Sequence, residues 1–272
     1  MKKNLFLLSL LFAIPFLFVA CNKDEDPVED DIEITTSEDV LTAQDLIQYT
    51  EEQVDYELEN RDPENDCPII TVDPDDGSYP RTITIDFGTE GCEGPHGRIR
   101  KGIILINVTD TMKNEGAVRT VEFLDFSVDD VLIAGTKTLT NEGLNADGLP
   151  VFSRIVSEAS LTFPNGDVAE WDAEQTLTLI EGSNTPQRFD DVMQIEGSSS
   201  GINRNDNPFT AEIIEPLIKP WACPWIVSGI RSVTVNDHTW TLDYGDGDCN
   251  KVALLTRPNG STKLVLIKKW WH

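Results

Sequence analysis

The sequence predicts an all-β protein in which one N-terminal helix precedes an antiparallel meander, forming a sandwich or a partly closed barrel. Two observations predict this fold class. Apolar and polar residues alternate along many short runs, as at Ile83, Ile85 and Phe87, which is typical of half-buried strands. Turn pairs such as Asn165-Gly166 separate these runs, and short turns join antiparallel neighbours. About a dozen strands are expected from this spacing.

Residues 1–20 have the composition of a signal peptide. Two lysines are followed by an almost wholly apolar stretch, and the small residue Ala20 lies directly before Cys21, as expected for a cleaved leader. Pro15 interrupts the apolar stretch, and the chain becomes acidic after Cys21 without a cationic stop signal. These features favour cleavage before Cys21 over a retained membrane-spanning helix.

The residues at the expected cleavage site, Phe18-Val19-Ala20-Cys21, resemble the lipobox of bacterial lipoproteins. Phe18 stands where leucine is commoner in that motif. The resemblance implies that Cys21 is acylated, becomes the new N-terminus and attaches the protein to a membrane. Several acyl chains give stable attachment, because each buried CH₂ contributes about 0.8 kcal/mol.

The acidic segment after Cys21 reads Asn22-Lys23-Asp24-Glu25-Asp26. It resembles the lysine-plus-acidic export signal of Bacteroidota lipoproteins, which implies a lipid-anchored protein on the outer face of the outer membrane. The alternative is a solvated acidic tether, and the two interpretations are compatible. Residues 21–36 are expected to form this tether and to be disordered.

Residues 37–60 are expected to form one amphipathic helix. Ser37 is a suitable N-cap, because its hydroxyl can accept a hydrogen bond from a free amide of the first turn. Apolar residues then recur at helical spacing: Val40, Leu41, Ala43, Leu46 and Ile47. The acidic stretch 61–66, which contains a proline, ends the helix.

The β domain, residues 67–272, contains an internal repeat. The segments 82–88 (TITIDFG) and 239–245 (TWTLDYG) are each preceded by Cys-Pro and followed by a further cysteine, giving related units at 67–92 and 223–249. An even number of cysteines in an exported chain argues for disulfides. The similar spacing predicts the pairs Cys67–Cys92 and Cys223–Cys249. Bridges between the two copies are the alternative.

Oxygen ligands gather at the end of the second repeat, where Asp243, Asp246, Asp248 and Asn250 lie within eight positions of the chain. Such clusters are typical of calcium sites, although the spacing does not match an EF-hand. The alternative is an ordinary strand end, in which Asp243 accepts hydrogen bonds from turn amides and the following glycine allows the turn. Apart from Ca²⁺, no cofactor is expected.

Tryptophans concentrate towards the C-terminus. Trp270 and Trp271 lie at the end of the chain and are the best candidates for exposed rings that stack on sugars. Trp240 shares its strand face with Leu242 and Tyr244, which predicts a place in the core. The terminal pair is therefore a candidate binding site.

The chain of 272 residues is strongly acidic, with 48 Asp and Glu against 21 Lys and Arg and a formal net charge of -27. Nucleic acids and anionic membrane surfaces would repel such a chain. We therefore expect no nucleic-acid partner, and the expected contact with a membrane is the lipid anchor.

Common catalytic motifs are absent from the sequence, including the Gly-x-Ser-x-Gly elbow and the His-Glu-x-x-His helix. We therefore favour a non-enzymatic binding or structural module for a glycan, lipid or protein, and nominate no catalytic residue. Two alternatives stay open. A carrier of an apolar ligand needs an open barrel with an unfilled apolar interior. A polysaccharide hydrolase needs two carboxylates facing each other across a cleft.

Overall fold

The computed structural model describes residues 27–59, 67–93, 97–185 and 187–267, with side chains of the first helix described from residue 32 to 48. The expected leader at 1–20, the expected lipidation site Cys21, and Trp270 and Trp271 lie outside these ranges.

The described residues form the helix α1 (Pro27–Glu59), the short 3-10 helix η1 (Arg188–Asp190) and a 14-stranded sheet. The strands are β1 (Ile69–Asp73), β2 (Arg81–Asp86), β3 (Cys92–Glu93), β4 (Ile99–Val108), β5 (Val118–Val128), β6 (Val131–Leu144), β7 (Pro150–Thr162), β8 (Val168–Glu181), β9 (Val192–Ile202), β10 (Pro208–Pro220), β11 (Ser228–Val235), β12 (His238–Asp246), β13 (Val252–Thr256) and β14 (Thr262–Leu266).

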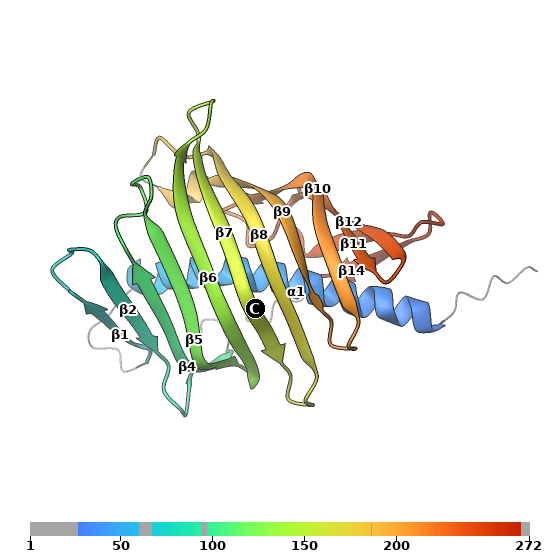
Figure 1. Ribbon diagram of the computed structural model, residues 1–272, viewed down its shortest axis with the longest axis horizontal. Coiled ribbons are helices and arrows are strands. Elements are labelled where there is room, and N and C mark those ends of the chain that lie inside the picture. The colour runs from blue at the N-terminus through green and yellow to red at the C-terminus, as the bar shows by residue number, and fades with distance from the viewer. Residues whose placement is uncertain (1–26, 60–66, 94–96, 186, 268–272) are drawn as a thin grey trace, which may run out of the picture.

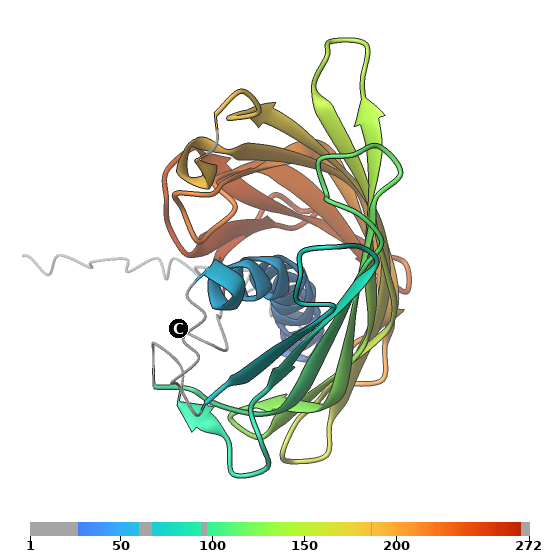
Figure 2. The same cartoon turned by 90° about the vertical axis from the view of Figure 1, so that its left-hand side faces the viewer.

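The sheet is an antiparallel meander, as the sequence predicts. Its order is β1-β2-β4-β5 and then consecutively to β14, while β3 pairs with β4 beside this path. All strands of the meander belong to one sheet. The fold is therefore not a sandwich, which would need two sheets packed face to face. Figure 2 shows that the sheet curves around α1, and its path runs from β1 to β14 without closing into a full barrel.

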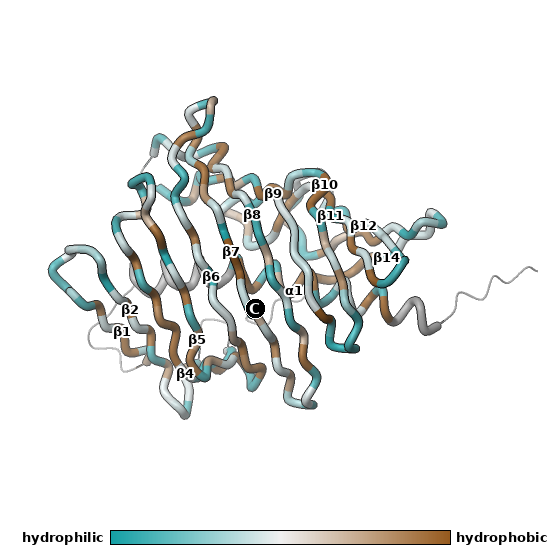
Figure 3. Tube along the Cα trace, in the orientation of Figure 1, coloured by the Kyte–Doolittle hydropathy of each residue, from teal (hydrophilic) through white to brown (hydrophobic). Residues whose placement is uncertain are grey.

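Alternation of side chains produces the concave apolar face of the sheet. In β8, buried and exposed residues alternate over ten positions, because successive side chains of a strand point to opposite faces. Trp171, Ala173 and Leu177 are buried on the side of α1. Apolar and polar positions also alternate along the strands in Figure 3. The alternation predicted from the sequence is therefore confirmed.

Register shifts bend the sheet. They interrupt the pairing of β5 with β6, of β6 with β7 and of β7 with β8, and such bulges increase local bending and twist. At Gly197 the φ angle is +123°, and a Cβ atom there would collide with the carbonyl of Glu174 on β8. Glycine is therefore required at this close approach.

The helix begins ten residues earlier than expected. The sequence predicts a start at Ser37 and a disordered tether up to residue 36, whereas α1 runs from Pro27 to Glu59. Proline is favoured at the first helical position, which accounts for the earlier start. Ser37 is therefore not a cap: its buried hydroxyl accepts a hydrogen bond from the Trp240 indole N–H at 2.8 Å. Within the described ranges, no helix combines the length and apolar character needed to cross a bilayer.

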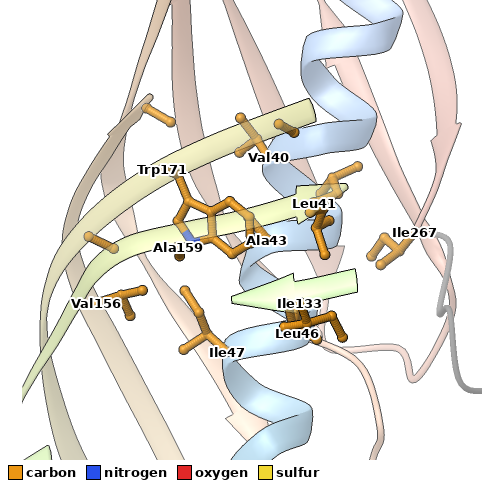
Figure 4. Close-up of a cluster of buried hydrophobic side chains, with 14 of the residues drawn as sticks. Val40, Leu41, Ala43, Leu46, Ile47, Ile133, Val156, Ala159, Trp171 and Ile267 are labelled. Atoms are coloured by element: carbon orange, nitrogen blue, oxygen red, sulfur yellow. The ribbon is translucent and has the colours of Figure 1, made fainter. Parts of the chain in front are cut away.

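The sheet encloses α1 more completely than an amphipathic pattern predicts. All residues from 39 to 48 are buried, including polar residues between the five apolar ones. Figure 4 shows part of the apolar contact, with Trp171 beside Val40 and Ala43, and Ile47 close to Val156. The predicted apolar positions are confirmed. The polar side of the helix is buried as well, because the sheet curves around it.

Both disulfides join cysteines within one copy of the repeat. Cys67 pairs with Cys92 and Cys223 with Cys249, at Cα separations of 5.6 and 5.8 Å. Each copy also forms the same kind of turn at the end of its strand. Asp86 Oδ1 accepts a hydrogen bond from the Gly88 amide at 2.8 Å, and Asp243 Oδ1 accepts one from the Gly245 amide at the same distance. The strand-end interpretation of Asp243 is confirmed, and Asp86 makes the same contact in the first copy.

Candidate functional site: a cleft beside the central helix

The interior of the curved sheet carries basic residues on several strands. Arg100, Lys137, Arg154, Lys219 and Arg231 are each at most 3% exposed and belong to β4, β6, β7, β10 and β11. A buried cation is costly unless oxygen acceptors surround it. The interior therefore requires acceptors along much of its length.

The central helix supplies many of these acceptors. Its sequence contains twelve Asp and Glu and no Lys or Arg. The Lys137 ammonium donates to the Ile47 carbonyl at 3.1 Å, and Arg231 donates to the Gln44 side chain at 2.7 Å. Asp39 accepts from Arg204. The acidic helix and the basic interior are therefore chemically complementary.

Arg154 is the most deeply buried of these cations, with 0% of its surface exposed. Its guanidinium donates to Gln175 of β8 at 2.5 and 3.1 Å and to Gln48 of α1 at 3.4 Å. Gln175 in turn donates to Gln44 at 2.8 Å. One network of hydrogen bonds thus connects two strands with two turns of the helix.

Beyond this network lies a cleft with two chambers, which share Phe152 and Asp191. The inner chamber, of about 100 Å³, reaches Gln48 of α1. The outer chamber, of about 490 Å³, lies between the β4–β5 loop, the β6–β7 hairpin and the segment that joins β8 to β9. The β6–β7 hairpin extends beyond the body of the sheet at the top of Figure 1. The outer volume is typical of small-molecule sites.

The inner chamber combines an apolar wall with a few polar groups. Its apolar lining is Leu139, Phe152, Leu177, Met193 and Trp221, and its polar lining is Gln48, Arg119, Asp191 and Lys219. Such a lining is typical of sites that bind small organic molecules and orient them through a few polar contacts.

Lys219 and Trp221 are fixed by the end of β10 and by the second disulfide unit. The Lys219 ammonium donates to the carbonyls of Cys223 at 2.7 Å and Pro220 at 3.1 Å. The Trp221 amide donates to the Asp191 carbonyl at 2.8 Å. The Arg188 guanidinium lies 5.5 Å from the centre of the Trp221 ring, within the range of a cation–π contact. One wall of the cleft is thus held by several contacts.

Charged residues of both signs line the two chambers. Among the described residues, the basic ones are Lys113, Arg119, Arg188 and Lys219, and the acidic ones are Glu115 and Asp191. Burial and the nearby Asp190 charge raise the pKa of Asp191, which weakens its negative charge at acidic pH.

The predicted oxygen cluster lies away from this cleft. Asp243 accepts from its own turn, Asn250 accepts from the Val252 amide at 3.1 Å, and Asp246 and Asp248 are exposed. Within the part of the chain that the structure describes, no three His, Cys, Asp or Glu side chains gather as metal ligands. The calcium site stays a prediction.

Sequence reasoning missed the residues that line the cleft. One feature was available: Arg154 shares its strand face with Phe152 and Val156, and Lys219 shares its face with Leu217. A basic residue at an apolar position of a strand indicates an interior that needs acceptors. The cleft itself depends on which loops meet, and the sequence pattern does not contain that information.

Comparison of the chain with known protein families, curated proteins and solved structures gave no match. The function of the cleft is therefore inferred from its own geometry and chemistry.

Proposed function

We propose that this protein is a lipid-anchored lipoprotein of the outer membrane surface that binds a small ligand in the cleft and does not catalyse a reaction. The cleft carries the proposal, because an outer chamber of about 490 Å³ shares Phe152 and Asp191 with an inner chamber that has an apolar wall and few polar groups. The lipobox-like segment ending at Cys21 and the acidic segment after it support the proposed location.

The position of α1 supports the cleft as the binding site, in preference to the interior of the sheet. A carrier of an apolar ligand in an open barrel needs an empty interior. Here residues 39–48 of α1 are all buried inside the curved sheet. The cleft lies beside the helix and reaches it at Gln48.

The binding proposal is tested by closing the mouth of the cleft. Ser183 is exposed and lines the outer chamber, so Ser183→Trp fills the mouth without disturbing the core. Asn184 is its exposed neighbour outside the lining, and Asn184→Trp is the matched control. We expect Ser183→Trp alone to abolish binding of hexanoate, hexyl phosphate or hexanol, measured by calorimetry. Equal binding by both variants would contradict the proposal.

The location is tested on whole cells. Cys21→Ala should release the protein from the membrane fraction, because the acyl chains supply the attachment. Protease added to intact cells should remove the body of the wild-type protein. Complete protection of the body in cells with a sealed outer membrane would contradict surface exposure.

The terminal tryptophans support a second mode of binding, to a glycan, and this mode also stays a proposal. Trp270 and Trp271 lie outside the described residues. A variant with both tryptophans changed to alanine should be retained less on a glycan array, because the stacking of sugar rings on aromatic rings would be lost. Unchanged retention would remove this mode.

A further inference from the structure

The last hairpin of the sheet carries aliphatic residues on its outer face. Alternate positions of β13 and β14 are buried in the core, as at Ala253 and Val265, so the positions between them point outward. Leu264 is 66% exposed and Leu266 is 52% exposed. The outward positions form what we call the hairpin patch, which consists of Val252, Leu254, Leu264 and Leu266.

The four residues of the hairpin patch are neighbours. Val252 lies opposite Leu266, and Leu254 lies opposite Leu264. Directly opposed residues of an antiparallel pair lie on the same face with their side chains in contact range. On β12 the next position is polar, because Asp243 lies opposite Leu254. The patch is therefore confined to the last two strands of the sheet.

The hairpin patch differs from the outer face of the central strand β8. There the exposed positions include Glu170, Asp172 and Glu174, as expected for a sheet face in water. Single exposed aliphatic residues are ordinary, whereas adjacent ones indicate a contact surface. The hairpin patch is therefore a candidate surface for an apolar partner.

The hairpin patch lies at the end of the molecule where α1 begins. The Arg257 guanidinium, in the β13–β14 turn, donates to the Glu33 carboxylate, and α1 also contacts β14. In Figure 1, the dark-blue start of α1 lies on the side of β12 and β14. Glu33 is six residues after Pro27, which corresponds to about 9 Å along a helix.

The proposed lipid anchor is close to this end of the molecule. Five residues of the sequence separate Cys21 from Pro27, and even a fully extended chain of this length spans only about 20 Å. Cys21 is therefore within about 30 Å of Glu33, which binds the hairpin turn. Acyl chains on Cys21 would thus hold this hairpin beside the bilayer.

We propose that the hairpin patch docks on the bilayer to which the protein is anchored, with Leu264 and Leu266 against the acyl-chain boundary. This inference rests on the proposed anchor at Cys21. The anchor makes the contact intramolecular, so a small apolar surface is sufficient at the high effective concentration of lipid. The formal charge of the chain is -27 and offers no attraction to an anionic surface, so the docking contact is apolar.

Docking of this hairpin also determines which edge of the sheet is remote from the bilayer. Successive turns of a meander lie at alternate edges, so the β13–β14 turn shares its edge with the β7–β8 and β9–β10 turns. The β4–β5, β6–β7 and β8–β9 connections, which line the outer chamber, lie at the opposite edge. The mouth of the cleft is therefore at the edge remote from the docked turn.

The test places a photo-cross-linking residue on the hairpin patch. The full lipidated chain is held in phosphatidylcholine nanodiscs, Leu264 is replaced by p-benzoylphenylalanine, and the adducts are identified by mass spectrometry after irradiation. We expect an adduct with phosphatidylcholine. Leu124 is 49% exposed on β5, far from β14 in the strand order. The same replacement at Leu124 is the matched control and should give at least about tenfold less lipid adduct.

A charged variant separates apolar docking from simple proximity to lipid. With the cross-linker at Leu266, Leu264→Asp should lower the yield of lipid adduct at least about tenfold, because burial of an unpaired carboxylate is costly. Leu124→Asp is the matched control and should leave that yield unchanged. Both substituted positions are exposed, so both variants should fold. Added salt should leave the adduct unchanged, because it screens charges and not apolar contacts.

The outcomes separate this inference from the proposed location. An acyl mass on Cys21 together with equal lipid adducts at Leu264 and Leu124 would keep the anchor and overturn the docking surface. A cross-link from Leu264 to a second copy, or to residues 268–272 of the same chain, would also overturn it. A lipid adduct at Leu266 that survives Leu264→Asp would overturn apolar docking. If Cys21 carries no acyl mass, both the proposed location and this inference are overturned.

Discussion

Two regions of the same concave surface differ in what fills them. Around Arg154 the chain itself fills the surface: Gln44 and Gln48 of α1 complete a network with Gln175. Around Arg119 and Lys219 the same kind of surface borders an open chamber. The comparison teaches that the described part of α1 completes the polar network around Arg154, whereas the chamber is formed where the ends of several strands meet their loops.

The largest expected effect comes from breaking the covered region. Arg154→Ala removes a fully buried guanidinium and leaves the Gln175 and Gln48 oxygens without their donor. We expect it to lower the free energy of unfolding by about 3–5 kcal/mol, measured by urea denaturation. Arg119→Gln, in the half-buried cleft, should cost less than about 1 kcal/mol. Equal losses would remove the distinction between the two regions.

The two disulfides sharpen the comparison, because they close loops of similar length but only one supports the cleft. Replacing either pair by serine should cost about 3 kcal/mol, since the cysteines are 25 and 26 residues apart. Only the Cys223→Ser and Cys249→Ser double variant should also weaken hexyl phosphate binding, because the Cys223 carbonyl holds Lys219. Calorimetry on both double variants checks this. Equal weakening would contradict the role of Cys223.

A smaller effect is expected where the helix meets Trp240. Ser37→Ala leaves the buried indole N–H without its 2.8 Å partner, and an unsatisfied buried donor costs about 1–3 kcal/mol. Urea denaturation measures the change, and Ser183→Ala, at an exposed position, is the control with no expected loss. If Ser37→Ala left the free energy of unfolding unchanged, α1 would be less firmly held than its burial indicates.

The pH dependence of binding gives the smallest expected effect. Burial and the Asp190 charge raise the pKa of Asp191, while Arg188 opposes the shift; Arg119 and Lys219 line the same chamber. As the pH falls through this raised pKa, Asp191 loses its negative charge, so affinity for hexyl phosphate should increase relative to Asp191→Asn, in which only the probe titrates. Asp191→Asn should bind more tightly at neutral pH and lose the increase. The same increase in Asp191→Asn would assign it to another group.

Much of the fold follows from local patterns. Alternation at residues such as Ile83 and Ile85 and recurrent turn pairs predict an antiparallel meander, and the repeated cysteine spacing predicts Cys67–Cys92 and Cys223–Cys249. These features depend on neighbours in sequence, so the sequence contains them directly.

The start of the helix and the cleft were not predicted, for different physical reasons. Residues 27–36 are rich in acids and resemble a tether, and their helical state depends on a sheet that is formed much later in the chain. The cleft depends on the curvature of the sheet, which bulges and Gly197 set, and on contacts such as Lys219 with the Cys223 carbonyl. A local sequence pattern does not contain information on such contacts.

A crystal structure of the protein with hexyl phosphate tests the central claim most directly. If the cleft is the ligand-binding site, the probe will lie within it, with the hexyl chain against Phe152 and α1 in place. A phosphate bound outside the cleft, or one that displaces α1 from the sheet, would contradict the claim.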